Sequence, residues 1–235
     1  MAKTKPANRR ARIEELRREQ QRAERRRTMI IILGCALVGL VIIGAAAWVP
    51  LSNWINDPAR KPMSAFGVAA ADAGLGKIVT DKAAKAAQHV PDGQKVPYKT
   101  APPTSGPHWA QPAPFERKFY TSQDRPQLET LVHNLEHGYT IVWYDDTIGK
   151  DGDQLDQLKD IAKRFESSQV DNAKKLIVAP WSATEGKFPA GKHIAFSHWS
   201  TGGGHRQYSA KVSGAAIEQF MKKYPAADAP EPNAA

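Results

Sequence analysis

The stretch Leu131-Val132-His133-Asn134-Leu135-Glu136-His137-Gly138 combines an apolar helical pattern with two histidines four residues apart. In a helix, His133 and His137 lie one turn apart on the same face, and Leu131 and Leu135 form an apolar ridge beside them. Neutral imidazole is the commonest metal ligand in proteins. The stretch therefore predicts a helix that packs on a core and presents two candidate ligands.

A proline-rich segment before this helix supplies further histidines. It runs from His89 to Phe119 and contains Pro102-Pro103-Thr104-Ser105-Gly106-Pro107-His108. Proline fixes φ, so such a segment can be ordered, and long ordered loops are often functional. We expect His108 to lie beside the helical pair, with His89 as a further candidate ligand.

These residues predict a transition-metal site. Three histidines with an open position suit Zn(II) or Cu(II), and Glu136 would serve as a ligand or orient one. Without a nearby Met or Cys, a blue-copper site is not expected. The candidate ligands are His89, His108, His133, Glu136 and His137.

Two other interpretations of the helix remain open. A helix C-terminus favours cationic side chains, which alone would account for His137. The spacing His133-x-x-Glu136-His137 also matches the inverzincin pattern, in which two histidines bind zinc and the glutamate activates water. However, Gly138 would end the helix directly after the second histidine, and the domain is small for a protease, so proteolysis is the weaker hypothesis.

The other histidines and a glycine run are not assigned to this site. His193 and His198 lie at odd spacing in a predicted strand, hence on opposite faces. His205 follows three glycines that resemble no phosphate-binding loop. Ser105 lacks the context of a serine nucleophile and suits a turn. No catalytic residue is therefore assigned.

Periodicity predicts the rest of the domain. The helix around His133 begins near Pro126, with Gly138 as its left-handed C-terminal residue. The other predicted elements are a strand at 139–144, a helix at 153–166, strands at 175–179 and 193–199, and a helix at 213–224. This order predicts an α+β fold, a small mixed sheet with packed helices, that is similar to the later part of a thioredoxin-like domain. Any such kinship would be of fold alone, because the chain has no Cys-x-x-Cys.

Residues 29–49 are 21 residues without a charge, enough to cross a bilayer as a helix. The basic flank before them predicts a cytoplasmic N-terminus and an exterior C-terminal domain, a single-pass protein of the cell membrane. Trp48 and Trp54 suit the outer interface. Cleavage after Ala47 is an open alternative. A lipobox-like match at Cys35 is set aside because too few apolar residues precede it.

Charge and cysteine content exclude several functions. Residues 1–28 hold eleven Lys/Arg and four Asp/Glu, a net of +7, which leaves 22 basic and 20 acidic residues, a net of +2, for the remainder. A nucleic-acid-binding domain needs a basic patch of its own, so this partner is not expected. The single cysteine, Cys35, lies in the apolar run, so neither a disulfide framework nor a thiolate site is expected.

Composition divides the chain into five parts. These are a basic cytoplasmic segment at 1–28, the transmembrane helix at 29–49, an Ala/Gly/Pro-rich stalk at 50–87, the exterior domain at 88–224 and a disordered tail at 225–235.

The two histidine motifs resemble those of the DUF3105 family, a bacterial family of domains of unknown function that is common in actinobacteria. The resemblance covers about 89–224 and rests on Tyr98, on 102–109, and on 131–138 followed by a strand ending in Tyr144. The matching positions are His89, His108, His133, Glu136 and His137. The resemblance implies frequent membrane anchoring and no established activity.

Three functional hypotheses follow. The first is a membrane-anchored exterior domain that binds copper or zinc through the histidine cluster. The second is a non-enzymatic accessory subunit of a membrane-protein complex, in which the same residues form a structural clasp between loop and helix. The third, a metal-dependent hydrolase, would need Glu136 to activate water.

Overall fold

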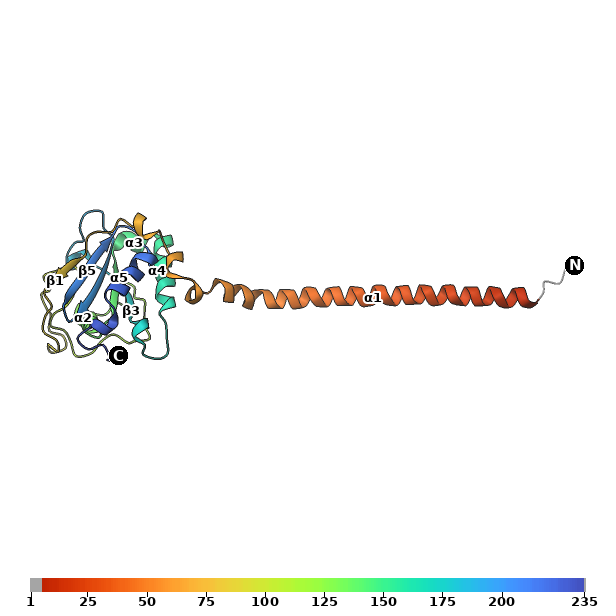
Figure 1. Ribbon diagram of the computed structural model, residues 1–235, viewed down its shortest axis with the longest axis horizontal. Helices are drawn as coiled ribbons and strands as arrows, with labels where there is room; N and C mark the ends of the chain where they lie inside the picture. Colours follow the sequence, from red (N-terminus) through yellow and green to blue (C-terminus); the bar gives the residue numbers. More distant parts are fainter. Residues whose placement is uncertain (1–5, 235) are drawn as a thin grey trace. The chain divides into compact units, whose positions relative to one another are not determined.

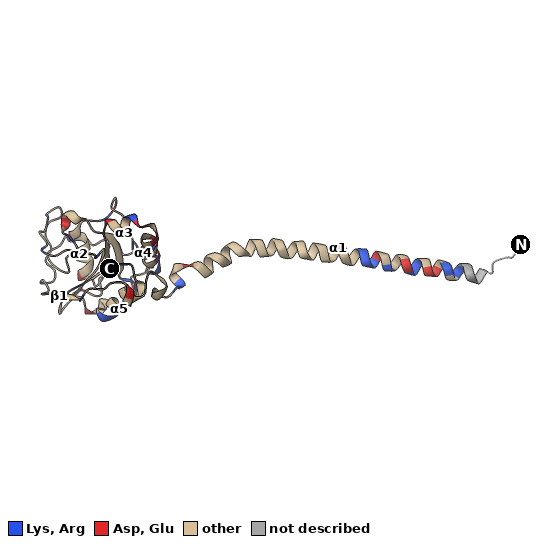
Figure 2. Ribbon diagram, turned by 90° about the horizontal axis from the view of Figure 1, so that it is seen from above, with Lys and Arg blue, Asp and Glu red and all other residues tan. Residues whose placement is uncertain are grey.

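The apolar run near the N-terminus lies in one long helix, α1 (Pro6–Asn56) (Figure 1). Lys, Arg, Asp and Glu colour its first part, and the part that follows is free of charge (Figure 2). The apolar side chains of this second part are exposed, as Leu40 is at 70%. By length and composition α1 can cross a membrane, which suggests an anchor or a signal sequence.

The computed structural model describes residues 6–234, with side chains from residue 10 on. Residues from Asp57 onward form a unit of their own, separate from α1. Two hydrophobic clusters formed by the described residues belong to this second unit. It is therefore a domain with its own core.

A five-stranded mixed sheet forms the centre of this domain. Its strands are β1 (Val79–Asp81), β2 (Thr140–Tyr144), β3 (Leu176–Pro180), β4 (Ile194–Ser200) and β5 (Gly203–Ser209), in the spatial order β1-β5-β4-β2-β3. Only β2 and β3 are parallel, and α4 (Gly152–Arg164) connects them. Strands β4 and β5 form an antiparallel hairpin, with His198 opposite His205.

Helices cover both faces of the sheet (Figure 1). Alternation along β2 places Val142 and Tyr144 in one cluster with α4 and α5 (Gly214–Lys223). Ile141 and Trp143 lie in the other cluster, with α2 (Leu128–Glu136) and the proline-rich segment. The short helix α3 (Asp146–Lys150) follows β2. The α2 face of the sheet carries the candidate metal residues.

The predicted α+β class, and every helix and strand predicted for residues 126–224, are confirmed. Strands β1 and β5 and helix α3 were not predicted. Strand β5 opens with Gly203 and Gly204, which indicate a loop rather than a strand. The structure requires a glycine at 204, because a Cβ there would lie 2.2 Å from Thr104 Oγ1.

Residues 57–87 and 225–234 differ from the predicted stalk and disordered tail. Met63, Phe66 and Ala73 are buried, and the first two belong to the core cluster under α5. In the tail, Ala229 is buried, and Lys175 Nζ donates hydrogen bonds to the carbonyls of Pro232 and Ala234 at 2.8 and 2.6 Å. Both segments are short of large apolar residues, so tertiary contacts rather than local pattern order them.

Candidate metal centre

The proline-rich segment is fixed to the sheet before it reaches His108. Arg206, on β5, donates to Asp81 Oδ2 at 2.8 Å and to the carbonyl of Pro102 at 3.0 Å. Thr104 Oγ1 donates to the same carboxylate at 2.9 Å. These buried and half-buried bonds, charge-assisted at Asp81, hold the loop against β1 and β5. The loop therefore delivers His108 on a rigid support.

His108 is fully buried, and its ring has a defined orientation. Its Nδ1 lies 2.8 Å from the carbonyl oxygen of Gly106. Since a carbonyl only accepts, Nδ1 carries the proton and donates it. When the ring is neutral, Nε2 is the unprotonated nitrogen, the form that a metal binds. His89 lies beside it, because the Val90 N–H donates to the His108 carbonyl at 2.8 Å and closes a parallel bridge.

Helix α2 supplies the other ligands, as its sequence predicts. Leu131 and Leu135 are fully buried, and Gly138 ends the helix with a φ of +90°. His133 Nδ1 lies 2.7 Å from the carbonyl of Trp109, so this ring too donates from Nδ1 and presents Nε2 as an acceptor. Two backbone carbonyls of one loop thus set two imidazoles in the same tautomer.

The structure brings four of the five candidate ligands together. One ligand atom from each of His89, His108, His133 and Glu136 lies within 4.8 Å of the others. Ligand atoms that share a tetrahedral ion at about 2.1 Å each lie about 3.4 Å apart, so the widest pair would have to close by up to about 1.4 Å. All but His89 are buried. This cluster could hold a metal ion.

His137, the fifth candidate, lies at the edge of the cluster rather than within it. Its Nε2 is 2.9 Å from His133 Nε2 and 3.7 Å from Glu231 Oε2 in the C-terminal segment. Since His133 Nε2 is an acceptor, His137 would donate to it in the metal-free protein. The i, i+4 spacing therefore does bring the two rings together, and Glu231 is a second carboxylate near them.

Glu136 faces His108 in an arrangement that a plain hydrogen bond does not explain. His108 Nε2 and Glu136 Oε2 are fully buried and 3.0 Å apart. Neither atom has a hydrogen-bond partner of acceptable geometry among residues 10–234. The other carboxylate oxygen, Oε1, accepts from the Ala87 N–H at 2.6 Å. One polar atom of each side chain is therefore anchored, while the other two lie 3.0 Å apart without a well-aligned hydrogen bond.

The protonation states suit metal binding at neutral pH. Burial, aided by the nearby His137, His108 and His89 and opposed by the hydrogen bond to Trp109, lowers the pKa of His133 to about 4. Burial would raise the pKa of Glu136, but a hydrogen bond and positive charge from a protonated His108, together with the Ala87 N–H, outweigh burial and hold the pKa below its usual value. Neutral imidazole and ionised carboxylate are the ligating forms.

The remaining histidines lie elsewhere. His193 Nδ1 pairs with Asp145 Oδ2 at 2.9 Å. His198 points to the α5 side of the sheet, where Nδ1 lies 3.2 Å from the Tyr139 carbonyl, and His205 stacks on Tyr224 at 3.8 Å between ring centroids. The described part of the chain thus places none of these three in the cluster, in line with the sequence assignment.

We expect His198 to make the domain sensitive to acid. Burial, aided by His205 and opposed by Tyr139 and Asp228, lowers its pKa to about 4 from an ordinary 6.5. The unfolded chain therefore binds this proton first, and about 3 kcal/mol of stability is lost as the pH falls from 6.5 to 4. Urea denaturation of metal-free His198→Asn, whose amide can still donate to the Tyr139 carbonyl, should show this much less pH dependence than wild type. Parallel stability curves for the two proteins would contradict the assignment.

Several groups that shape the cluster escape sequence reasoning. The carbonyls of Gly106 and Trp109 and the N–H of Ala87 are backbone atoms, and any residue carries them. Lys175 is fully buried and donates to the carbonyl of His137 at 2.8 Å as well as to the tail. Glu231 follows a proline in a segment without periodicity. No local signal marks either side chain, since their positions depend on the folded tail.

Comparison with known proteins gives one match. A family model described as Protein of unknown function (DUF3105) matches residues 89–235, more than half of the chain. Searches of curated proteins and of solved structures find no match. The matched range contains all five candidate ligands.

Proposed function

Because the chain belongs to the DUF3105 family, whose description assigns no function, we propose a function from the geometry of the site. The protein is a membrane-anchored domain on the cell exterior that binds one transition-metal ion, Cu(II) or Zn(II). The ligands come from His108, His133 and Glu136, completed by His89 or His137. Imidazole and carboxylate suit both metals.

The pair of His108 and Glu136 carries this proposal. With Nδ1 donating to Gly106, a neutral His108 has its unprotonated Nε2 3.0 Å from Glu136 Oε2, and both side chains are fully buried. Such a contact between two acceptors is unfavourable unless a cation lies between them. Two atoms that share an ion at about 2.05 Å each are about 2.9 Å apart at a right angle and about 3.4 Å apart at a tetrahedral angle, which brackets the observed separation.

The long helix supports the membrane location. Its basic part precedes its uncharged part, which favours a cytoplasmic N-terminus and an exterior domain. The order β5-β4-β2-β3, with α4 joining the parallel pair, supports the thioredoxin-like arrangement. This similarity concerns the fold and not the redox chemistry of thioredoxins, since the single cysteine of the sequence, Cys35, lies in α1. A membrane-protein complex is the kind of partner that this location favours.

Metal binding should appear as thermal stabilisation of the full chain in detergent. After chelator treatment, Cu(II) or Zn(II) at about 100 times its Kd should add about 2.7 kcal/mol, a rise in Tm of roughly 5–10 °C for a domain of this size. Plasma emission spectrometry should find about one ion per chain. The metal that gives the larger shift at equal concentration identifies the preferred ion.

Two variants make this test specific. His133→Ala/His137→Ala should show neither bound metal nor a rise in Tm. His193→Ala removes a histidine outside the cluster and should respond as wild type does. Wild type without bound metal and without a shift for either ion, or a double variant that still binds one ion per chain, would rule out the proposal.

The structural clasp is the second candidate, and the same pair of residues favours it. A protonated His108 would form a buried ion pair with Glu136 at 3.0 Å, which would join the loop to α2 without any metal. The alternatives differ in what occupies the space at Nε2, a proton or a metal ion. Among the described residues nothing favours the hydrolase, because Glu136 faces His108 and Ala87 rather than a free space for water.

A further inference from the structure

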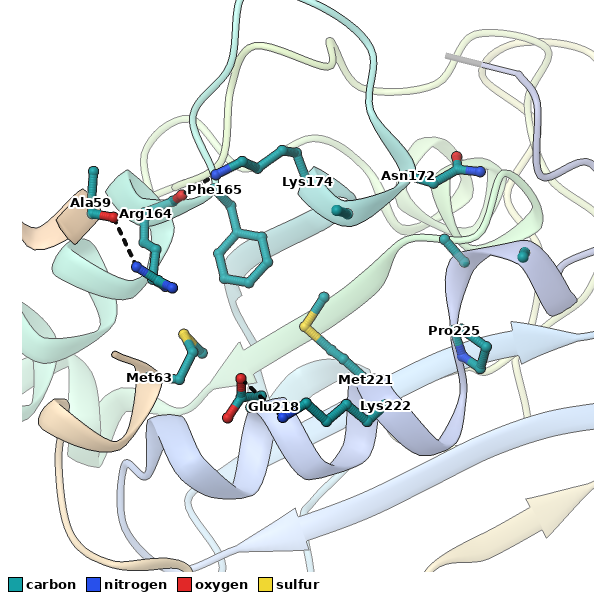
Figure 3. Close-up of a pocket in the computed structure, with 13 residues that line it drawn as sticks. Ala59, Met63, Arg164, Phe165, Asn172, Lys174, Glu218, Met221, Lys222 and Pro225 are labelled. Carbon is teal, nitrogen blue, oxygen red and sulfur yellow. Dashed lines mark hydrogen bonds and ion pairs between the residues drawn. The ribbon is translucent and has the colours of Figure 1, made fainter. Parts of the chain in front are cut away.

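A cavity of about 730 Å³ lies among the ends of α4 and α5, on the face of the sheet opposite the histidine cluster (Figure 3). The residues that join α1 to the domain contribute Ala59 and Met63 to its wall. A volume of this size is typical of sites for small organic ligands. The metal proposal leaves this cavity without a role.

The floor of the cavity is apolar and adaptable. Figure 3 shows the side chains of Met63, Phe165 and Met221 directed into the space between the elements. Ala173, Ala226 and Pro225 add small apolar walls. Methionine is unbranched and polarisable, so a surface with two methionines can accommodate a flexible chain. This lining fits a hydrocarbon segment better than a polar metabolite.

The rim of the cavity is positively charged. Arg164 donates to the carbonyl of Ala59 at 2.8 Å, and Lys174 donates to the carbonyl of Arg164 at 2.8 Å. Both acceptors are neutral carbonyls, and among residues 10–234 neither cation forms an ion pair. The cavity lining contains one acid, Glu218, and it pairs with Lys222 at 3.2 Å. An occupant should therefore carry an anionic group beside its apolar part.

Chain connectivity keeps this cavity near the end of the apolar helix. Asn56 ends α1, and Ala59 is the third residue after it. Three residues of fully extended chain span at most about 11 Å. If residues 29–49 cross a bilayer, the seven helical residues up to Asn56 add about 10 Å, so Ala59 is tethered within about 21 Å of the end of the span.

We propose that this cavity binds an anionic phospholipid of the membrane that α1 crosses. Part of one acyl chain lies against Met63, Phe165 and Met221, and the phosphate lies between Arg164 and Lys174. Bound lipid would hold the domain at the bilayer surface. The inference rests on the membrane anchoring in the proposed function but not on metal binding.

Photocrosslinking in vesicles tests this site. The full chain is reconstituted in phosphatidylcholine with a trace of phosphatidylglycerol that carries a photoreactive acyl chain, and labelled peptides are mapped by mass spectrometry. We expect label on α1 and also on peptides from 57–65 and 213–224. An equal amount of photoreactive phosphatidylcholine should label the cavity peptides at least about fivefold less, since each cation near an anionic group contributes about that factor.

Two variants address the two halves of the site. Arg164→Gln/Lys174→Gln should reduce the preference for phosphatidylglycerol to about one. Met221→Glu should remove label from the cavity, whereas Gln219→Glu, on an exposed position of the same helix, should not. Thermal unfolding of each variant verifies that the domain is folded.

Each adverse outcome has its own meaning. Label on α1 without label on the cavity peptides would overturn the lipid site alone. No label on α1 would overturn the membrane anchoring and with it this inference, while the metal titration would still stand. Equal labelling by both lipids would refute an anionic ligand, and crosslinks between two copies at these peptides would assign the cavity to a second chain instead.

Discussion

Replacement of Gly67 by alanine is expected to lower the free energy of unfolding of the domain by about 4 kcal/mol. Gly67 has a φ of +72°, where an L-residue is strained by about 1–2 kcal/mol. A Cβ there would also lie 2.1 Å from the carbonyl oxygen of Val212, a backbone atom that cannot rotate away. The segment that contains Met63 and Phe66 would have to separate from the start of α5.

Two further glycines separate the backbone strain at positive φ from the steric clash of the added Cβ. Gly93 has a φ of +85° with no heavy atom within 4 Å of its would-be Cβ, so Gly93→Ala should cost only the strain. Gly152, the first residue of α4, has open space and no positive φ, so Gly152→Ala should gain up to about 1 kcal/mol. Urea denaturation monitored by tryptophan fluorescence gives all three values. Equal losses for Gly67→Ala and Gly93→Ala would show that residues 63–67 are not packed on the domain.

This experiment concerns the part of the fold that sequence alone describes poorly. The elements from 126 to 224 follow from periodicity, because each buries one face: Leu131 and Leu135 on α2, or Val142 and Tyr144 on alternate positions of β2. Residues 57–87 have few large side chains, and Met63 and Phe66 have helical spacing over too short a stretch to predict a buried helix face. Only the folded partner, α5, makes them part of the core.

The candidate site likewise has features that local sequence predicts and features that depend on tertiary contacts. The spacing of His133 and His137 on one helix is a local property, and the sequence predicts it correctly. The position of His108 beside Glu136 is not local, and it follows from the bonds of Asp81 and Arg206 to the loop at Thr104 and Pro102. Sequence therefore identifies which residues to consider. It does not reveal that His89, and not His137, joins His108, His133 and Glu136 in the cluster.

Replacement of Glu136 by glutamine should weaken metal binding at least about 100-fold, while the metal-free protein changes by no more than about 1 kcal/mol. The glutamine carbonyl can still accept from the Ala87 N–H, and its amide NH₂ takes the place of Oε2, 3.0 Å from His108 Nε2. An amide donor facing an imidazole lone pair forms a hydrogen bond, which compensates for the lost charge. The metal, in contrast, loses an anionic ligand.

The structural clasp predicts the opposite pattern. If His108 is an imidazolium paired with Glu136, the neutral amide breaks a buried ion pair, at a cost of about 3–5 kcal/mol with or without metal. Urea denaturation at about pH 8, above the ordinary pKa of histidine, with chelator and then with metal at about 100 times the wild-type Kd, separates the two. For a metal site, the stability difference between wild type and Glu136→Gln should grow by about 2 kcal/mol when metal is added, because wild type gains about 2.7 kcal/mol and the variant gains little. A large stability difference between wild type and Glu136→Gln that metal does not change would assign the cluster to the clasp. The matched control is Glu129→Gln, which changes a buried acid on the same helix outside the cluster. This variant should respond to metal as wild type does.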